Sequence, residues 1–217
     1  MARSETVAGR GVVTGIGPDP RHPGAIRIAV EGRITWTVPG GTFERLGVRV
    51  GQPVGEAQRA DLAAAADEEA AWRALLQHLE RRPFAQQDLG RRLRQRGHPA
   101  GAVTAAVERA AAAGLLDDRG FARSFAETRS ARGRGPARLR RDLAAQGVAR
   151  EVIDQVLEEL WPDGEGPEDM ARSLARKRAG QLASLPLPDR RRRVLAYLAR
   201  RGFTGLQARK VVREVVG

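Results

Sequence analysis

The stretch Leu139-Arg-Arg-Asp-Leu143-Ala-Ala-Gln-Gly147 has counterparts with the same spacing at residues 89–97 and 194–202. In each copy, apolar residues stand eight and four positions before a glycine, and others stand six and ten positions after it. Spacings of four on both sides of a glycine predict two amphipathic helices, with the glycine in the left-handed conformation that ends the first. The predicted core positions are Leu89, Leu93, Val103 and Val107; Leu139, Leu143, Ile153 and Leu157; and Val194, Leu198, Ala208 and Val212.

These copies recur with periods of 50 and 55 residues and predict three repeats. We interpret each repeat as three helices, of which the second runs through about residues 84–96, 136–146 and 189–201. Repeats of this length form supersecondary units that stack on their neighbours. The predicted fold is therefore mainly α: a tandem array of three three-helix repeats, preceded by a small β-rich module. The expected domains are 1–60, 61–116, 117–162 and 163–217.

The N-terminal module is predicted from alternating apolar residues. Ile26, Ile28 and Val30, and then Ile34, Trp36 and Val38, fit an antiparallel pair with a three-residue loop at 31–33, which pairs 30 with 34, 28 with 36 and 26 with 38. A further strand is expected at 11–16, a helical turn at 42–46 capped by Thr42 and ended by Gly47, and a long helix from about residue 58. Trp36 could stack on a nucleobase, but its alternating position favours a place in the core.

Positive charge is concentrated in the second helices of the repeats. The chain has a net charge of +12, of which residues 1–67 contribute +1 and the three second helices +10. Solvated helix faces would explain a single arginine cluster, but the recurrence favours a stripe that meets a polyanion or an acidic protein. The candidate binding residues are Arg91, Arg92, Arg94, Arg96, Arg138, Arg140, Arg141, Arg190, Arg191, Arg192, Arg193, Arg200 and Arg201.

The run Arg190–Arg193 opens a predicted helix, where cations oppose the helix macrodipole. A stabilising role is therefore the weaker explanation for these four residues, and contact with a negative partner is the stronger one. The pattern does not decide whether that partner is phosphate or an acidic protein surface.

Catalytic and cofactor sites are not predicted. Asp117 and Asp118 could form a metal-binding pair, but no third ligand stands at a suitable spacing, and an aspartate before a helix is ordinarily its N-cap. The segment Gly133-Arg-Gly-Pro136 lacks the lysine and hydroxyl residue of a phosphate loop, so we interpret it as a turn that places Pro136 in the first helical position. We expect a non-enzyme without metal or cofactor.

The cellular setting is predicted from absences in the sequence. The chain has no cysteine, no apolar run of membrane-spanning length, and no apolar signal core in its first eleven residues. A cytoplasmic protein without a membrane contact is expected. A hinge is expected at 161–167, because its glycines and prolines cannot continue a helix. The third repeat is expected to pack more loosely on its neighbour, because its connection at 181–189 is longer and carries two prolines.

The central repeat resembles the RecX family of regulatory proteins. The resemblance rests on Gly114-Leu-Leu-Asp-Asp118 followed by Arg119-Gly-Phe-Ala122, and extends over about residues 11–216. The residues of the family signature, structural or binding, are Asp117, Asp118, Phe121, Phe125, Arg129, Gly133, Gly135 and Pro136. His98 departs from the pattern, because an apolar residue is usual after the helix-ending glycine.

The resemblance implies a modulator that binds the RecA nucleoprotein filament and depresses its ATP hydrolysis and strand exchange. Its implied partners are the RecA filament and single-stranded DNA, with double-stranded DNA as a further candidate, and a monomer is expected. The alternative from charge and helices alone is a DNA-binding module that acts as a transcriptional or architectural factor. A sequence-specific reader would need base-contacting amides, and the second helices contain no asparagine.

Overall fold

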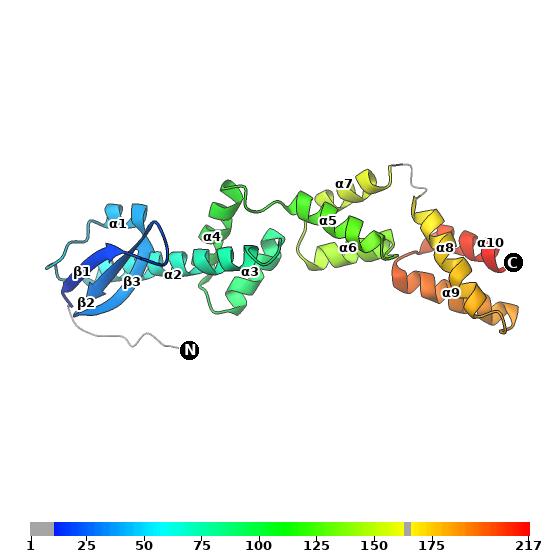
Figure 1. The fold of residues 1–217 in the computed structure, drawn as a ribbon, viewed down its shortest axis with the longest axis horizontal. Coiled ribbons are helices and arrows are strands. Elements are labelled where there is room, and N and C mark those ends of the chain that lie inside the picture. Colours follow the sequence, from blue (N-terminus) through cyan, green and yellow to red (C-terminus); the bar gives the residue numbers. More distant parts are fainter. Residues whose placement is uncertain (1–10, 163–165) are drawn as a thin grey trace. The chain divides into compact units, whose positions relative to one another are not determined.

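The computed structural model describes residues 11–162 and 166–217 (Figure 1). Its described part forms two compact units, one of residues 11–82 and 89–115, and one of 83–88, 116–162 and 166–217. Ten helices and three strands in the described part confirm the mainly α fold with a small N-terminal sheet. The predicted hinge at 161–167 falls partly on residues outside the described ranges.

The first unit begins with a three-stranded antiparallel sheet in the order β1-β2-β3. The strands are β1 (Val13–Pro18), β2 (Ala25–Val30) and β3 (Arg33–Pro39). The predicted pairs of residue 28 with 36 and of 26 with 38 are confirmed, but Ala29 stands opposite Ile34 and Val30 opposite Arg33. The prediction of a three-residue loop was therefore wrong.

The reason for the changed register lies in the turn. Glu31 and Gly32 both have positive φ, 50° and 73°, as in the two-residue hairpin turns whose twist matches that of the strands. An irregularity in β3 then restores the predicted pairing further along the sheet. Ile34 is displaced from the core by this arrangement and is 61% exposed, whereas Trp36 is buried, as predicted.

Two helices follow the sheet. Helix α1 (Gly40–Leu46) begins earlier than predicted and has Pro39 rather than Thr42 at its N-cap, while Gly47 ends it in the left-handed conformation as expected. Helix α2 (Glu56–Leu79) is long enough to serve two neighbours: Leu62 and Ala65 join the core under the sheet, and its later turns pack on α4 (Ala100–Ala112). In that second contact, the Arg109 guanidinium lies 4.0 Å from the Trp72 ring centre.

The second unit contains two three-helix groups. The first group consists of α5 (Asp118–Ser130), α6 (Pro136–Ala145) and α7 (Arg150–Leu160) around Leu139, Leu143 and Ile153. The second consists of α8 (Gly166–Gln181), α9 (Leu187–Arg201) and α10 (Gly205–Val216) around Val194, Leu198 and Val212. All predicted core positions of these two repeats are buried.

The glycine that ends each second helix has the predicted conformation. In α3 (Gln86–Gln95), α6 and α9, the terminating Gly97, Gly147 and Gly202 have φ of 93°, 83° and 92°. The amide after each glycine donates to the carbonyl of the leucine five residues earlier, over 3.0–3.2 Å. This is the hydrogen-bond pattern of a Schellman motif, and it closes all three helices.

Two of these glycines also lie at contacts between repeats. A side chain on Gly147 would approach the Gln87 Cβ to 2.5 Å, in the first turn of α3, and one on Gly202 would overlap Arg138 in the first turn of α6. Gly135 lies against Gly202 and Phe203, and its amide donates to the Arg201 carbonyl over 2.7 Å. The helices α3 and α6 therefore begin against the glycines that end α6 and α9, respectively.

The two roles of these glycines can be separated by comparing Gly147→Ala with Gly97→Ala. In both variants the free energy of unfolding should fall by about 1–2 kcal/mol, because alanine is strained in the left-handed backbone conformation. A Cβ at Gly97 would stand in open space, whereas one at Gly147 would collide with Gln87. Only Gly147→Ala should therefore lower the free energy of unfolding by a further amount of about 1 kcal/mol or more, from overpacking. Urea denaturation followed by circular dichroism measures both; equal losses would contradict the contact with Gln87.

Candidate binding surface

The predicted binding arginines of α6 are engaged in contacts within the second unit. The Arg138 Nε lies 2.9 Å from Asp142 Oδ1, and the Arg140 Nε donates to Asp154 Oδ1 over 3.0 Å. The hydrogen bond from Arg140 lowers the pKa of Asp154. Arg141 donates to the Ala137 carbonyl over 3.3 Å. Such exposed pairs contribute about 0–1 kcal/mol and exchange readily for other partners.

Two residues of the run at the start of α9 make contacts that the sequence did not indicate. The Arg190 Nη2 donates to the Val216 carbonyl over 3.4 Å, and the Arg191 Nη2 donates to that of Gly217. These carbonyls end α10, where the macrodipole is negative and favours cations. These two contacts oppose the expectation that a stabilising role is the weaker explanation, and that expectation stays a prediction for Arg190 and Arg191. Arg192 pairs with Asp189 over 3.0 Å.

Four of the predicted binding residues have no side-chain hydrogen bond or ion pair in the described part of the chain, and we call them the open arginines. Within residues 11–162 and 166–217, the structure gives no side-chain hydrogen bond or ion pair to four exposed arginines, Arg94, Arg96, Arg193 and Arg200. The first two belong to the first unit and the last two to the second. A single stripe along all the second helices stays a prediction.

The two aspartates of the family signature each cap a helix. Asp117 is the N-cap of α5, as predicted, and its Oδ1 accepts from the Gly120 amide over 2.9 Å. Asp118 Oδ1 accepts from the Gln86 amide over 2.8 Å and so satisfies a donor at the start of α3. The adjacent carboxylates thus serve two different helices, a link that sequence spacing alone did not reveal.

The other signature residues have packing or turn roles. Phe121 and Phe125 lie against the core of the α5–α7 group with ring centres 6.0 Å apart, and the Arg129 guanidinium lies 5.0 Å from the Phe125 ring centre. Pro136 stands in the first turn of α6, as predicted, after the turn that contains Gly133 with φ of 77°. These residues therefore pack the α5–α7 group and form the turn that leads into α6.

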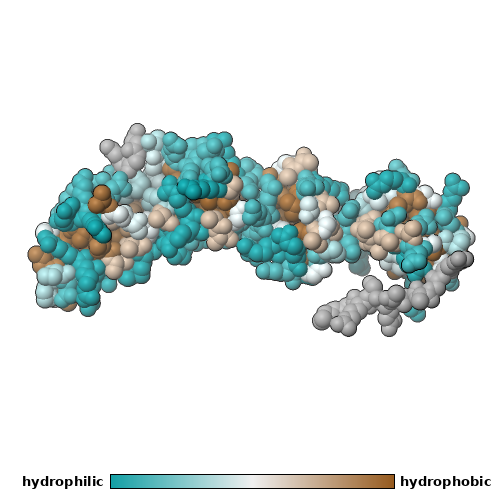
Figure 2. Space-filling model, turned by 180° about the vertical axis from the view of Figure 1, so that it is seen from behind, coloured by the Kyte–Doolittle hydropathy of each residue, from teal (hydrophilic) through white to brown (hydrophobic). Residues whose placement is uncertain are grey.

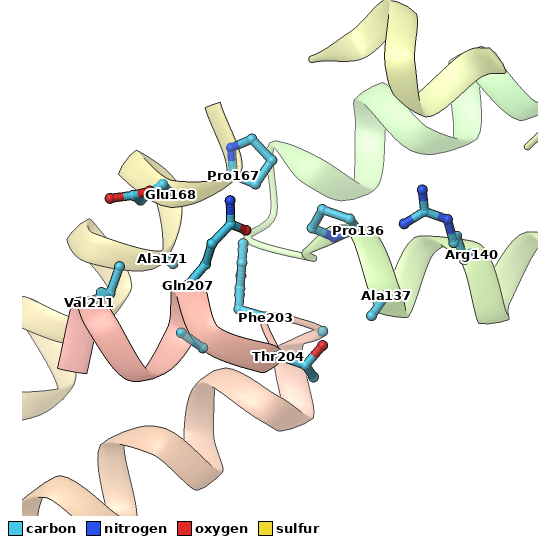
Figure 3. Close-up of a pocket in the computed structure, with 12 residues that line it drawn as sticks. Pro136, Ala137, Arg140, Pro167, Glu168, Ala171, Phe203, Thr204, Gln207 and Val211 are labelled. Carbon is cyan, nitrogen blue, oxygen red and sulfur yellow. The ribbon is translucent and has the colours of Figure 1, made fainter. Parts of the chain in front are cut away.

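A small cavity of about 200 Å³ lies between the two groups of the second unit. Figure 3 shows its lining, with Pro136, Ala137 and Arg140 of α6 on one side and residues of α8 and α10 on the other. Its charged residues are already paired: Arg140 with Asp154, and Glu168 with Arg172 over 2.8 Å and with Lys210 over 3.2 Å. Ligand pockets usually have volumes of about 300–1,000 Å³, and this cavity is smaller. We therefore interpret it as a gap in the packing between the two helical groups.

A cluster of charged residues ties the β1–β2 loop of the first unit to neighbouring elements. The buried Asp19 accepts from the Arg21 amide over 2.8 Å and from Arg27 over 2.9 Å, and lies 3.2 Å from the His22 ring. Burial by itself raises the pKa of Asp19, but the hydrogen bonds from Arg21, Arg27 and His22 outweigh it and lower the pKa to about 2. Arg73 of α2 approaches the same carboxylate to 4.0 Å.

The described residues contain no group of three or more histidine, cysteine, aspartate or glutamate side chains arranged to hold a metal ion. In the same part of the chain, no helix combines the length and apolar character needed to cross a membrane. Figure 2 shows a face that is mostly hydrophilic, with hydrophobic residues in smaller patches. The two three-helix groups of the second unit define the architecture of a helical repeat protein.

Comparison with known proteins identifies the family. Residues 117–157 match the second three-helix domain of RecX, and residues 167–212 match the third. The regulatory protein RecX of Halorhodospira halophila is 40% identical over 148 residues, which are 67% of this chain and 88% of that protein. The regulatory protein RecX of Acidithiobacillus ferrooxidans is 36% identical over 146 residues, 65% of this chain and 85% of that protein.

A solved structure supports the same fold. The crystal structure of a regulatory protein RecX superimposes with a TM-score of 0.75 at 22% sequence identity, and the match covers 94% of this chain and 98% of that one. The chain belongs to the RecX family of regulatory proteins, as its central signature predicted. Its relatives are named as regulatory proteins and not as enzymes.

The contacts of α9 with the end of α10 predict an unequal effect of two arginine variants. Arg190→Ala combined with Arg191→Ala should lower the free energy of unfolding by about 1 kcal/mol, because the carbonyls of Val216 and Gly217 lose their cationic donors. Arg193→Ala, the matched control, should stay within about 0.5 kcal/mol of the parent. Thermal and urea denaturation measure the difference, and a neutral double variant would show that these contacts contribute nothing.

The Asp19 cluster predicts a pH-dependent contribution to stability. Because the folded-state pKa is about 2 and the unfolded value is about 3.9, the contribution is present above pH 4 and is lost as the pH falls toward 2. Asp19→Asn should therefore be less stable than the parent at pH 7, and the gap should close between about pH 4 and 2. A gap that is constant with pH would contradict this origin.

Proposed function

We propose that this protein binds the nucleoprotein filament of the RecA recombinase and inhibits its ATPase and strand-exchange activities. Recombination, DNA repair and the SOS response would be modulated in this way. The observation that carries the proposal is membership of the RecX family, together with stacked helical units whose second helices hold most of the net charge. We further infer that it acts as a monomer in the cytoplasm, where the recombinase meets chromosomal DNA.

The architecture supports a filament as the partner. A filament presents the same surface at regular intervals, and an array of similar units can contact several of these surfaces at once. Linked contacts of this kind raise the overall affinity far above that of a single unit. The open arginines of α3 and α9 supply cations for acidic protein surface or for the phosphates of single-stranded DNA.

The test is the ATPase activity of the cognate recombinase on single-stranded DNA. The protein should slow ATP hydrolysis at well below one molecule per recombinase protomer. No effect at saturating protein would overturn the proposal, and would leave a DNA-binding transcriptional or architectural factor as the alternative, to be tested by binding to duplex DNA without recombinase.

A charge-matched pair of variants tests whether the second-helix arginines contribute. Arg193→Glu with Arg200→Glu reverses two open cations on α9, whereas Arg209→Glu with Arg213→Glu reverses two exposed cations on α10 by the same total charge. The α9 pair should weaken inhibition about tenfold or more, and the α10 pair should have a smaller effect. Equal losses would indicate a general effect of net charge and not a contact at the second helices.

A further inference from the structure

A second and larger hollow, of about 510 Å³, lies between the two helical groups of the second unit. It is lined by the loop after α5, by α8 and by α9, and we call it the basic groove. Four of its lining residues are cations, Arg132, Lys177, Arg178 and Arg201, and beside them lies the ring of Tyr197. Among the described residues that line the groove, none is an aspartate or a glutamate.

The guanidinium groups of the basic groove are held in place by neutral partners. The Arg201 Nη1 donates to the Arg132 carbonyl over 3.0 Å, and its guanidinium carbon lies 5.1 Å from the Tyr197 ring centre. Arg178 donates to the Gln181 side-chain oxygen over 2.9 Å, and its guanidinium carbon lies 5.7 Å from the same ring centre. The buried Nε of Arg178 has no hydrogen-bond acceptor. These contacts fix position without neutralising charge.

One cation of α8 outside the groove is compensated by carboxylates. Arg172, on the same helix as Lys177, contacts the carboxylates of Glu168, Asp169 and Glu214. For the side chains of Arg132 and Lys177, in contrast, the described residues provide no ion pair. Four cations around one concave surface without a counter-charge repel one another, and an anion that enters the groove relieves this repulsion. The arrangement therefore indicates an anionic ligand.

The shape and the lining favour one class of anion. Besides the cations, the groove contains the Tyr197 ring, the apolar side chains of Met170 and Leu174, and the polar groups of Ser173 and Gln181. Phosphates are bound by arginine, lysine, hydroxyl and amide groups, whereas unstacked bases and sugars lie on aromatic and apolar surface. A duplex keeps its bases paired inside a rigid rod, but a single strand can turn them toward such a surface.

We propose that the basic groove binds the backbone of single-stranded DNA, with phosphates at Arg132, Lys177, Arg178 and Arg201 and with a base or sugar near Tyr197. This assignment deepens the proposed function and rests on its DNA contact. It adds three cations, from the α5–α6 loop and α8, to the arginines indicated by the sequence. Arg201 donates to the Arg132 carbonyl, which lies in the turn just after the C-terminal end of α5.

The test measures binding of the full chain to a fluorescently labelled oligothymidylate by anisotropy, without recombinase. Arg132→Glu with Lys177→Glu should weaken binding about tenfold or more and reduce the slope of log affinity against log salt by about 0.7 per lost contact. The control is Arg209→Glu with Arg213→Glu, which makes the same change of charge on α10 outside the groove. An equal loss in the control, or no binding by the parent protein, overturns the proposal.

The role of the ring is tested by Tyr197→Leu and Tyr197→Phe. The phenylalanine variant keeps the aromatic surface and should bind as the parent does, whereas the leucine variant should bind several-fold more weakly, with thermal denaturation confirming that both are folded. Duplex DNA or polyglutamate that competes as well as unlabelled oligothymidylate would overturn the choice of ligand.

Recombinase inhibition by the same variants separates this inference from the proposed function. Loss of binding to bare DNA in Arg132→Glu with Lys177→Glu, but not in the control, supports the groove even if the parent protein fails to inhibit the recombinase; that failure would overturn only the proposed function. Inhibition by the parent protein, with bare-DNA binding unchanged in the groove variant, would overturn only the groove.

Discussion

The stacking of the helical groups depends on the absence of side chains at the glycines that end the second helices. Gly147 and Gly202 each satisfy two constraints, because the left-handed backbone closes one helix and the missing Cβ leaves room for the first turn of another. Gly135 meets the same contact from the opposite side, where its amide donates to the carbonyl of Arg201. The same glycine therefore ends one helix and allows a contact with residues far away along the chain.

In the described part of the chain, acidic residues neutralise some cations and leave others without an ion pair. Glu159, for example, accepts from both Arg119 and Arg123, and these hydrogen bonds lower its pKa. Around the basic groove no such acid is present among the described lining residues, and cation–π and carbonyl contacts orient the guanidinium groups instead. A density of arginine along the sequence is thus a poor measure of binding capacity, because what matters is which cations the fold leaves uncompensated.

The sequence predicted the features that repeat and missed those that depend on distant residues. Leucines such as Leu139 and Leu143 and the glycine that follows them have local causes, namely helical periodicity and a left-handed helix end, and these were correct. The hairpin register failed, because a positive φ at a non-glycine residue, Glu31, is not indicated by its type. The contacts of Arg190 with Val216, and of Arg201 with Arg132, join residues 26 and 69 positions apart and leave no periodic signal.

The segment 83–88 packs with the α5–α7 group, although it is not adjacent to that group in the sequence. Ala85 is fully buried in the core of α5–α7, and the amide of Gln86 is satisfied by Asp118, although more than 25 residues of the first unit separate this segment from α5. A gene exchange between two relatives with a crossover at Leu116 would therefore pair a core from one parent with the alanine and helix start of the other. This group stays intact only if two separate stretches of the gene are inherited from the same parent.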